Sequence, residues 1–267
     1  MSNRNWFLNC RRTFGLIAVA AVLASSARAS VLKEAKITQV IKDVKLLPPN
    51  AQPRPATISD DVRQGTAVHT GTDSRAELQF TDLTIARLGA NTIFSFNEGT
   101  RTVDLSGGAI LLRVPKDSGG AKVQTGAVTA AITGTTVIVE YHSVSASASP
   151  VAKRNAYAKY IVLEGTMRVY LKGQIGESIL MTAGQMLIVK PNARSLPDAV
   201  DVDLKRLRAT TLFLQGGWRP IGSEPLMAKE QMAQLDRKAN GTLVDTNLVI
   251  FGRGTLVSLT DPTSLNT

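Results

Sequence analysis

The stretch His69–Gly89, HTGTDSRAELQFTDLTIARLG, brings a histidine, an aspartate, a serine, an arginine and a glutamate close together in sequence. Imidazole, carboxylate and hydroxyl groups are the ones that perform acid–base and nucleophilic catalysis. Within this stretch, however, polar and apolar residues alternate, which is typical of a strand with one face on a core. In such a strand the apolar residues Ala76, Leu78 and Phe80 would point to the core. The polar residues Arg75, Glu77 and Gln79 would point to solvent. Because side chains on opposite faces of a strand cannot converge on one substrate, we interpret the stretch as structural.

The chain has only two histidines, and neither marks a second catalytic centre. His69 and His142 each stand at the end of a predicted strand, where a polar side chain usually faces solvent. A metal site built on both would need a carboxylate between them, such as Glu140, and no motif imposes that geometry. We therefore predict no catalytic residue, no cofactor-binding residue, no cofactor and no metal ligand.

Acidic residues raise two other hypotheses. The run PDAVDVD could ligate calcium, but it lacks the turn glycine and the bidentate glutamate of calcium loops. The same run, which contains Asp198, Asp201 and Asp203, also fits an ordinary loop or the start of a helix. An enzyme acting on an envelope polysaccharide would draw its acids from three glutamates, Glu77, Glu140 and Glu164. We place this hypothesis behind two non-enzymatic ones and predict that the protein is not an enzyme.

The first 29 residues have the layout of a secretory signal peptide. Arginines precede an apolar segment at 14–24, and the Ala-x-Ala motif Ala27–Ala29 offers a cleavage site before Ser30. Eleven apolar residues are too short to cross a hydrocarbon core of about 30 Å, so we expect cleavage rather than anchoring. The pair Arg11–Arg12 also resembles a twin-arginine signal. We predict a periplasmic or extracellular protein, exported by the Sec route in preference to the twin-arginine route.

The charge and the cysteine content of the chain limit which partners it could bind and which reactions it could perform. Removal of the leader takes away four arginines and no acids, so the formal charge of the chain falls from +10 to +6. The remaining basic residues are scattered and only Trp218 remains as tryptophan, whereas nucleic-acid grooves combine a basic stripe with stacking aromatics. Cys10 also leaves with the leader, which excludes disulfides and thiolate chemistry. We predict no nucleic-acid partner and no transmembrane segment in the exported chain.

Most of the exported chain predicts short strands, which follow one another from Lys36 to Lys190 and are separated by Gly, Pro, Asn and Asp. We expect one strand over 36–47, two strands joined by a turn at Ser106–Gly108, and either three short or two bent strands over 122–142. The fold class is therefore an all-β core of short, mostly antiparallel strands, resembling a β-sandwich or a β-roll, with a C-terminal helix.

Near Asp198 the strand-like alternation ends and the sequence pattern changes. Ser223 is a candidate N-cap, Pro225 falls in the first turn and Gly241 follows the end, so we predict a helix between Ser223 and Gly241. Four apolar residues at helical spacing form a stripe that we expect to dock on the β core, namely Leu226, Met227, Met232 and Leu235. A final strand pair is predicted over 247–259.

Three segments resemble the FecR domain, an extracytoplasmic sensor module named after the ferric-citrate regulator. GTAVHTGTDSRAELQFTDLTIARLGANTIFSF is similar to its opening pattern, VDLSGGAILLRV to its central segment and KVQTGAVTAAITGTTVIV to its closing segment. The residues of the closing match are Val123, Thr125, Gly134, Thr135 and Val137. The resemblance covers roughly Lys36 to Tyr141, and YIVLEGTMRVYL with LMTAGQMLIV looks like the β extension that commonly follows it.

The resemblance implies a binding or signalling role. Its best-understood members are transmembrane regulators that control an extracytoplasmic-function sigma factor and respond to an outer-membrane transporter. Here only 13 residues precede the apolar segment of the leader, too few for a sigma-binding domain. We therefore expect an exported non-enzymatic sensor or scaffold of the bacterial envelope that binds an envelope protein or polymer. The alternative is a structural component of the envelope or surface that self-associates through its strand edges.

The expected organisation has four parts. Residues 1–29 form the cleaved leader, 30–142 the FecR-like β domain, 151–196 a β extension packed on it, and 197–267 a C-terminal segment with one helix and a terminal strand pair.

Overall fold

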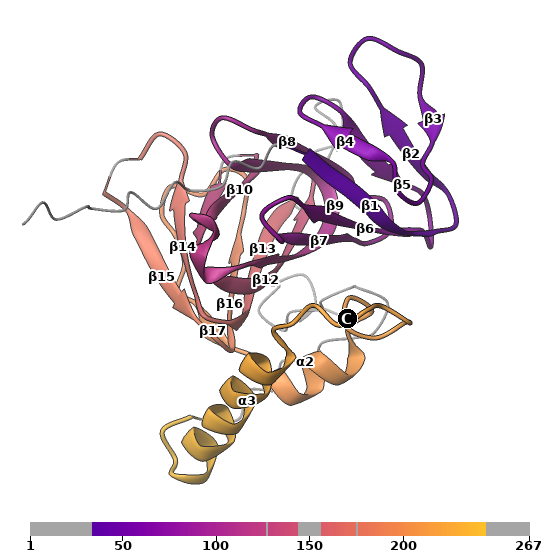
Figure 1. Ribbon diagram of the computed structural model, residues 1–267. Helices are drawn as coiled ribbons and strands as arrows, with labels where there is room; N and C mark the ends of the chain where they lie inside the picture. Colours follow the sequence, from indigo (N-terminus) through magenta and orange to yellow (C-terminus); the bar gives the residue numbers. More distant parts are fainter. Residues whose placement is uncertain (1–33, 127, 144–155, 175, 244–267) are drawn as a thin grey trace, which may run out of the picture.

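The computed structural model describes residues 34–126, 128–143, 156–174 and 176–243. Its body consists of strands, and two helices lie on one side of them, as Figure 1 shows. The predicted fold class, an all-β core with a C-terminal helix, is confirmed. Within the described part of the chain, no helix combines the length and hydropathy needed to span a bilayer. The predicted leader and the predicted strand pair over 247–259 lie outside the described residues.

The described residues contain seventeen strands, which make up two sheets that share one long strand, β9. The first sheet runs in the spatial order β4 (Asp61–Arg63), β1 (Glu34–Ile41), β6 (Arg75–Phe80), β7 (Ile85–Leu88), β9 (Thr102–Val114), β12 (Thr135–His142), β13 (Tyr157–Glu164), β16 (Gln185–Val189), β17 (Val200–Asp201). The second sheet runs in the order β3 (Arg54–Pro55), β2 (Val44–Leu47), β5 (Ala67–Thr70), β8 (Ile93–Asn97), β9, β10 (Ala121–Thr125), β11 (Val128–Ile132), β14 (Thr166–Leu171), β15 (Ser178–Thr182). Neighbouring strands are antiparallel except for the parallel pair β9–β10.

Strand β9 joins the two sheets, and this corrects one prediction. The predicted turn at Ser106–Gly108 does not form, because β9 continues through it. Its first half pairs with β8 and β10, and its second half pairs with β7 and β12. Gly108 adopts φ +89°, and a Cβ placed there would lie 2.4 Å from the Cα of Thr92. The glycine therefore allows a bend in one strand, where we expected a turn between two.

Other strand boundaries also differ from the sequence pattern. The single strand predicted over 36–47 is divided into β1 and β2, because Lys42 adopts φ 62° and redirects the chain from the first sheet to the second. Of the two alternatives for 122–142, the structure has three strands, β10, β11 and β12. A short 3₁₀ turn, η1 (Lys116–Ser118), connects β9 to β10.

The main core lies between the two sheets. It is built mostly from small aliphatic side chains that both sheets turn inward, such as Leu78 and Ile110 from the first sheet and Val68 and Val123 from the second. Phe80 packs edge-on against Phe96, with ring centroids 4.9 Å apart. Ala76, Leu78 and Phe80 are all buried, as the alternation in β6 predicts.

Two helices follow the strands. The predicted helix is present as α3 (Glu224–Ala239), which begins after Ser223 and contains proline in its first turn. The apolar stripe was predicted wrongly: only Met227 is buried, whereas three members stay 40–58% exposed, Leu226, Met232 and Leu235. A second helix, α2 (Leu204–Thr210), was not predicted as an element, although Asp203 caps it by accepting the backbone N–H of Arg206.

We predict that Gly108→Ala destabilises the exported protein by more than about 2 kcal/mol, because a left-handed conformation alone costs an L-residue about 1–2 kcal/mol and the new Cβ also meets backbone. Urea unfolding measures the change. Gly173→Ala is the matched control, since Gly173 has φ +83° and a Cβ added there would have nothing within 4 Å. Equal losses for the two variants would contradict a bend that depends on the close approach to Thr92.

Candidate functional site

The C-terminal segment covers the central part of the outer face of the first sheet. Sheet residues Leu111, Ile138 and Ile161 form a second buried cluster with side chains from the segment, including Leu207, Phe213 and Met227. This second core explains why these strands carry apolar residues on both faces. The segment from β17 through α3 therefore belongs to the folded body of the protein (Figure 1).

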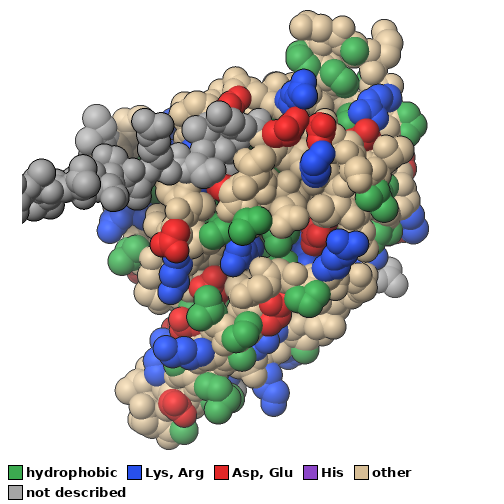
Figure 2. Space-filling model, viewed as in Figure 1, with side chains coloured by type: hydrophobic (Ala, Val, Ile, Leu, Met, Phe, Trp, Pro, Cys, Tyr) green, Lys and Arg blue, Asp and Glu red, His purple; other side chains and the backbone are tan. Residues whose placement is uncertain are grey.

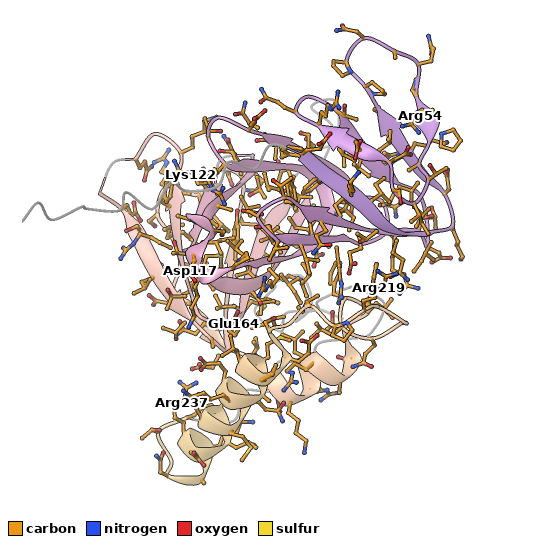
Figure 3. All side chains as sticks on the ribbon, viewed as in Figure 1. Arg54, Asp117, Lys122, Glu164, Arg219 and Arg237 are labelled. Carbon is orange, nitrogen blue, oxygen red and sulfur yellow. The ribbon has the colours of Figure 1, made fainter. Side chains whose placement is uncertain are left out.

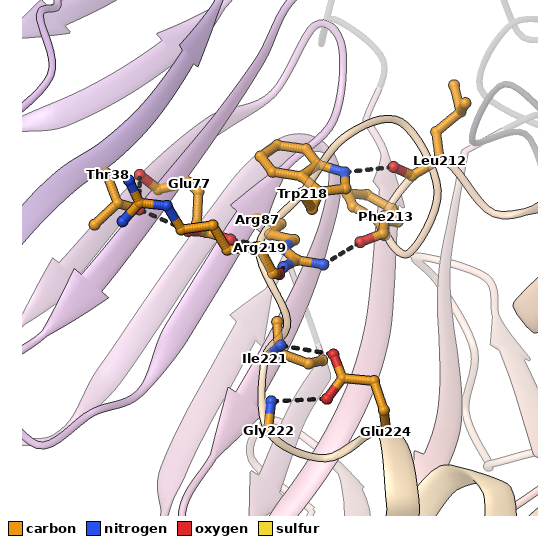
Figure 4. A network of polar contacts seen from close by, with 10 residues as sticks. All are labelled: Thr38, Glu77, Arg87, Leu212, Phe213, Trp218, Arg219, Ile221, Gly222 and Glu224. Atoms are coloured by element: carbon orange, nitrogen blue, oxygen red, sulfur yellow. Dashed lines mark hydrogen bonds and ion pairs between the residues drawn. The ribbon is translucent and has the colours of Figure 1, made fainter.

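A single arginine on β7 ties the loop after α2 to the sheet. Arg87 is 1% exposed, and its Nε donates to a carboxylate oxygen of Glu77 at 2.8 Å. Its Nη1 donates to the carbonyl oxygen of Phe213 at 2.6 Å, and its Nη2 donates to the carbonyl oxygen of Arg219. Figure 4 shows the three contacts converging on one guanidinium. A planar fork with donors in three directions suits this task, and a lysine could not reproduce it.

Trp218 covers the same guanidinium. The Cζ atom of Arg87 lies 4.9 Å from the ring centroid, and that of Arg75 lies 5.9 Å from it. The indole N–H donates to the carbonyl oxygen of Leu212 at 2.6 Å, which fixes the ring in the loop (Figure 4). Cation–π contact of this kind is attractive and strengthens when the cation is removed from water. Burial lowers the pKa of Arg87, while the hydrogen bond to Glu77 opposes that shift.

Glu77 corrects the prediction that this face of β6 points to solvent. Gln79 is exposed, but Glu77 is only 5% exposed. The hairpin register places Glu77 directly opposite Arg87, and Thr38 donates to its second oxygen at 2.7 Å. Alternation correctly separates the two faces of a strand, but it does not say whether a distant segment covers the polar one. The opposite charges across the hairpin were the available signal.

Two further contacts hold α3 against the rest of the protein. The hydroxyl of Thr136 on β12 bonds the hydroxyl of Ser223 at 2.8 Å and a carboxylate oxygen of Glu164 at 3.0 Å. Burial raises the pKa of Glu164, and the bond from Thr136 partly offsets that rise. Gln234, buried on α3, accepts the backbone N–H of Leu204 at 2.9 Å and thereby links α3 to the start of α2.

A cavity of about 440 Å³ lies where α2, the loop 211–222 and α3 meet over β7. Lining residues come from β7 (Arg87), α2 (Lys205, Arg208, Ala209), the loop (Leu214, Gln215, Trp218, Arg219, Pro220) and α3 (Glu224, Met227, Gln231). Figure 3 labels Arg219 on this loop, well below Arg54 of β3 in the view. The cavity has the size range of small-molecule sites and is the candidate functional site. The sequence pattern predicted no binding role for any of these residues; Met227 was expected only to dock the helix on the β core.

The residues considered for catalysis from sequence do not converge, and among them only Glu77 contacts a residue of the cavity wall, Arg87. His69 is on β5 in the second sheet, whereas His142 ends β12 in the first sheet and stacks on Tyr157 with ring centroids 5.7 Å apart. Glu140 accepts from the buried Lys159 at 3.2 Å and from the hydroxyl of Tyr157. The described residues contain no cluster of three or more histidine, cysteine or acidic side chains that could hold a metal.

The three glutamates and the acidic run are also separate. Glu77, Glu140 and Glu164 each have their own partner, and Glu140 stands four residues along β12 from the partner of Glu164, roughly 13 Å at the rise of a strand. In the acidic run, Asp203 caps α2 and lies 3.5 Å from the Nζ of Lys238, so the helix-start alternative holds for this residue.

Comparison with known proteins identifies the class of this two-sheet module. Residues 66–168 match the sequence model of the family described as FecR protein. No curated protein matches the chain.

The chain therefore contains a FecR domain, as its motifs predicted, although the match starts and ends later than the Lys36–Tyr141 range expected. It includes strands β5 to β13 and the first residues of β14, and hence Glu77 and Arg87, while Phe213, Trp218 and the helices lie outside it.

Two crystal structures of a "putative anti-sigma factor" from Parabacteroides distasonis are similar to the chain. The first shares 16% identity at a TM-score of 0.42 and covers 54% of this chain and 62% of its own. The second shares 17% identity at a TM-score of 0.44 and covers 72% of this chain and 82% of its own. The chain thus spans less than two thirds of the first structure's length.

We predict that Arg87→Met lowers the free energy of unfolding by about 3–5 kcal/mol, because it leaves the buried carboxylate of Glu77 without its cation. Urea unfolding gives the value, and the fluorescence of Trp218, the ring that covers Arg87, reports release of the loop. Arg63→Met is the matched control: Arg63 pairs with Glu34 at 3.0 Å but is 77% exposed, so its loss should leave the stability nearly unchanged. Similar small losses for both variants would show that the Arg87 contact does not hold the segment.

Proposed function

We propose that this protein is an exported, non-enzymatic binding protein of the bacterial envelope that acts as a sensor or scaffold and relays envelope signals. The observation that carries the proposal is the FecR domain at 66–168, because this domain resembles extracytoplasmic sensor modules. A leader at 1–29 would deliver the domain to the periplasm or the outside of the cell, where its partner would be an envelope protein or polymer.

The arrangement of acidic residues supports a binding role over catalysis. General acid–base chemistry requires groups that face the same substrate within hydrogen-bonding reach. Glu77 and Glu140 are instead paired with buried cations on different strands, and Glu164 is bonded to a threonine. Each carboxylate supports the fold where it stands.

Site-specific cross-linking tests the proposal. Because no cysteine follows Ala29, an introduced cysteine would be the only thiol of the exported protein. Single cysteines would replace three well-exposed apolar residues on separate surfaces, Ile58, Leu83 and Leu180. Each variant is expressed in a bacterium that carries the gene and treated with a thiol-reactive photo-cross-linker in intact cells. We expect one envelope component to form an adduct at one or two of these positions but not at all three, and excess protein without cysteine to suppress the adduct.

The cysteine-free parent protein is the control for reagent-independent adducts. Adducts of equal intensity at all three positions, or none in cells that fully export the protein, would contradict a specific binding surface. Retention in the cytoplasm with an uncleaved leader would contradict the envelope role itself.

Strand β15 favours the alternative, self-association as a structural component of the envelope or surface. The other edge strands are protected: β3 contains Pro55, β4 carries Asp61 and Arg63, and β17 has two residues. The sequence of β15, SILMT, has neither charge nor proline, and Leu180 is 52% exposed. Unprotected edges of this kind are templates for pairing with another chain.

We predict that, if copies associate through β15, Leu180→Lys lowers the self-association constant at least about tenfold, since a charge on an edge opposes pairing. Sedimentation over a wide concentration range measures it. Ile93→Lys is the matched control, because Ile93 is 42% exposed on the same sheet but lies on an inner strand. A protein that is monomeric at every concentration would eliminate this alternative.

A further inference from the structure

The cavity beside Arg87 concentrates positive charge. Four cationic residues line it, Arg87, Lys205, Arg208 and Arg219, against one carboxylate, Glu224. On the face shown in Figure 2, by contrast, basic and acidic side chains are interspersed. The excess at the cavity is therefore local and does not simply reflect the basic composition of the chain.

Three of the four cations are not neutralised by the protein. Arg87 is paired with Glu77, but Lys205, Arg208 and Arg219 form no ion pair with a carboxylate among the described residues. Surface lysines and arginines often lack a partner, and Lys205 and Arg219 are exposed. Arg208 is different, because it is half-buried in the cavity wall.

Arg208 is also short of acceptors. One of its terminal nitrogens donates to the side-chain oxygen of Gln231 at 2.6 Å, a neutral acceptor. Its Nε is buried and has no hydrogen-bond partner among the described residues. In the described part of the chain, the guanidinium of Arg208 thus has one neutral side-chain acceptor and no carboxylate partner, and a negative charge bound in the cavity would offset the cost of its partial burial.

The carboxylate of Glu224 offsets at most one of the four positive charges, because it forms no ion pair with any of them and acts on Arg87 only from a distance. Its two oxygens accept the backbone N–H groups of Ile221 at 2.7 Å and Gly222 at 2.8 Å (Figure 4). The residue thus closes the turn that leads into α3, and both oxygens are already engaged with backbone donors.

We propose that this cavity binds a small oxyanion with at least two negative charges, whose carboxylate or phosphate groups are held by Arg208 and Lys205. Arginine recognises either group with paired charge-assisted hydrogen bonds, and lysine adds a compact point charge. The volume of about 440 Å³ accommodates a small molecule. Trp218 and Met227 give the cavity apolar wall for the uncharged part of the ligand. Such an anion would be the ligand of the proposed sensor, so the biological meaning of the site rests on the proposed function.

Calorimetry on the purified exported protein tests the proposal with two probes, inorganic pyrophosphate for phosphoryl ligands and malonate for carboxylates. We expect saturable binding of at least one probe at low ionic strength, weakened by added sodium chloride. Arg208→Gln should lower the affinity at least about tenfold, as expected for loss of charge-assisted hydrogen bonds. Trp218 fluorescence gives a second readout, because Trp218 lines the cavity and is the only tryptophan after residue 29.

Arg206→Gln is the matched control. Arg206 is an exposed arginine of the same helix, and it does not line the cavity. The Arg206→Gln variant should bind the probe with an affinity within about twofold of the parent protein's, because a side chain outside the cavity adds only a screened electrostatic interaction. Equal unfolding midpoints for Arg208→Gln and the parent protein establish that the variant is folded, and Arg208→Lys, which keeps the charge, should recover part of the affinity.

Two results would overturn the proposal: no saturable binding of either probe at millimolar concentration, or the same loss of affinity in Arg206→Gln as in Arg208→Gln. The second result would mean that the probe responds to net charge and not to this cavity. Anion binding needs no macromolecular partner, so its failure would leave the cross-linking experiment untouched. Conversely, a protein that binds pyrophosphate but forms no adduct in cells would lose the proposed function and keep the anion site.

Discussion

The buried guanidinium of Arg87 is the contact on which the rest of the structure depends. One side of it meets the carboxylate of Glu77 within the FecR domain, and the other side meets two carbonyl oxygens of the loop after α2. The loop would otherwise have to leave those carbonyl groups without donors in a water-poor interface, which costs free energy. The same contact holds Trp218 over β7 and thereby forms one wall of the cavity.

Local pattern predicted much of the fold. Alternation placed Ala76, Leu78 and Phe80 in the core, and turn and cap residues located the beginning of α3 at Ser223. These features depend on the few residues beside them, which is why one sequence suffices. The bend at Gly108 was missed for a related reason. Two glycines suit a turn as well as a bend, and only the close approach of Thr92, sixteen residues away in sequence, decides between them.

The candidate site could not be predicted in the same way, because it is made by contacts across long stretches of chain. Arg87 and Phe213 are 126 residues apart, and no periodicity connects them. One signal was nevertheless present. The strands containing Leu111, Ile138 and Ile161 are apolar on both faces, which is typical of a sheet covered on both sides. That pattern calls for a second layer, and the only remaining described segment able to provide it contains α2 and α3.

The cavity lies mostly outside the FecR match, which suggests where the ligand specificity of this protein would come from. Of the lining residues, Arg87 lies within 66–168, and all the others belong to the segment from Lys205 to Gln231. Arg87 is neutralised by Glu77, so the uncompensated charge comes entirely from the added segment. The FecR domain thus supplies a rigid floor and one anchoring cation, while the segment packed on it supplies the groups that would select a ligand. Substitutions at Lys205 or Arg208 would therefore alter which anion binds without disturbing the two-sheet core, whereas a substitution at Arg87 would alter both, because it is the residue that the core and the cavity share.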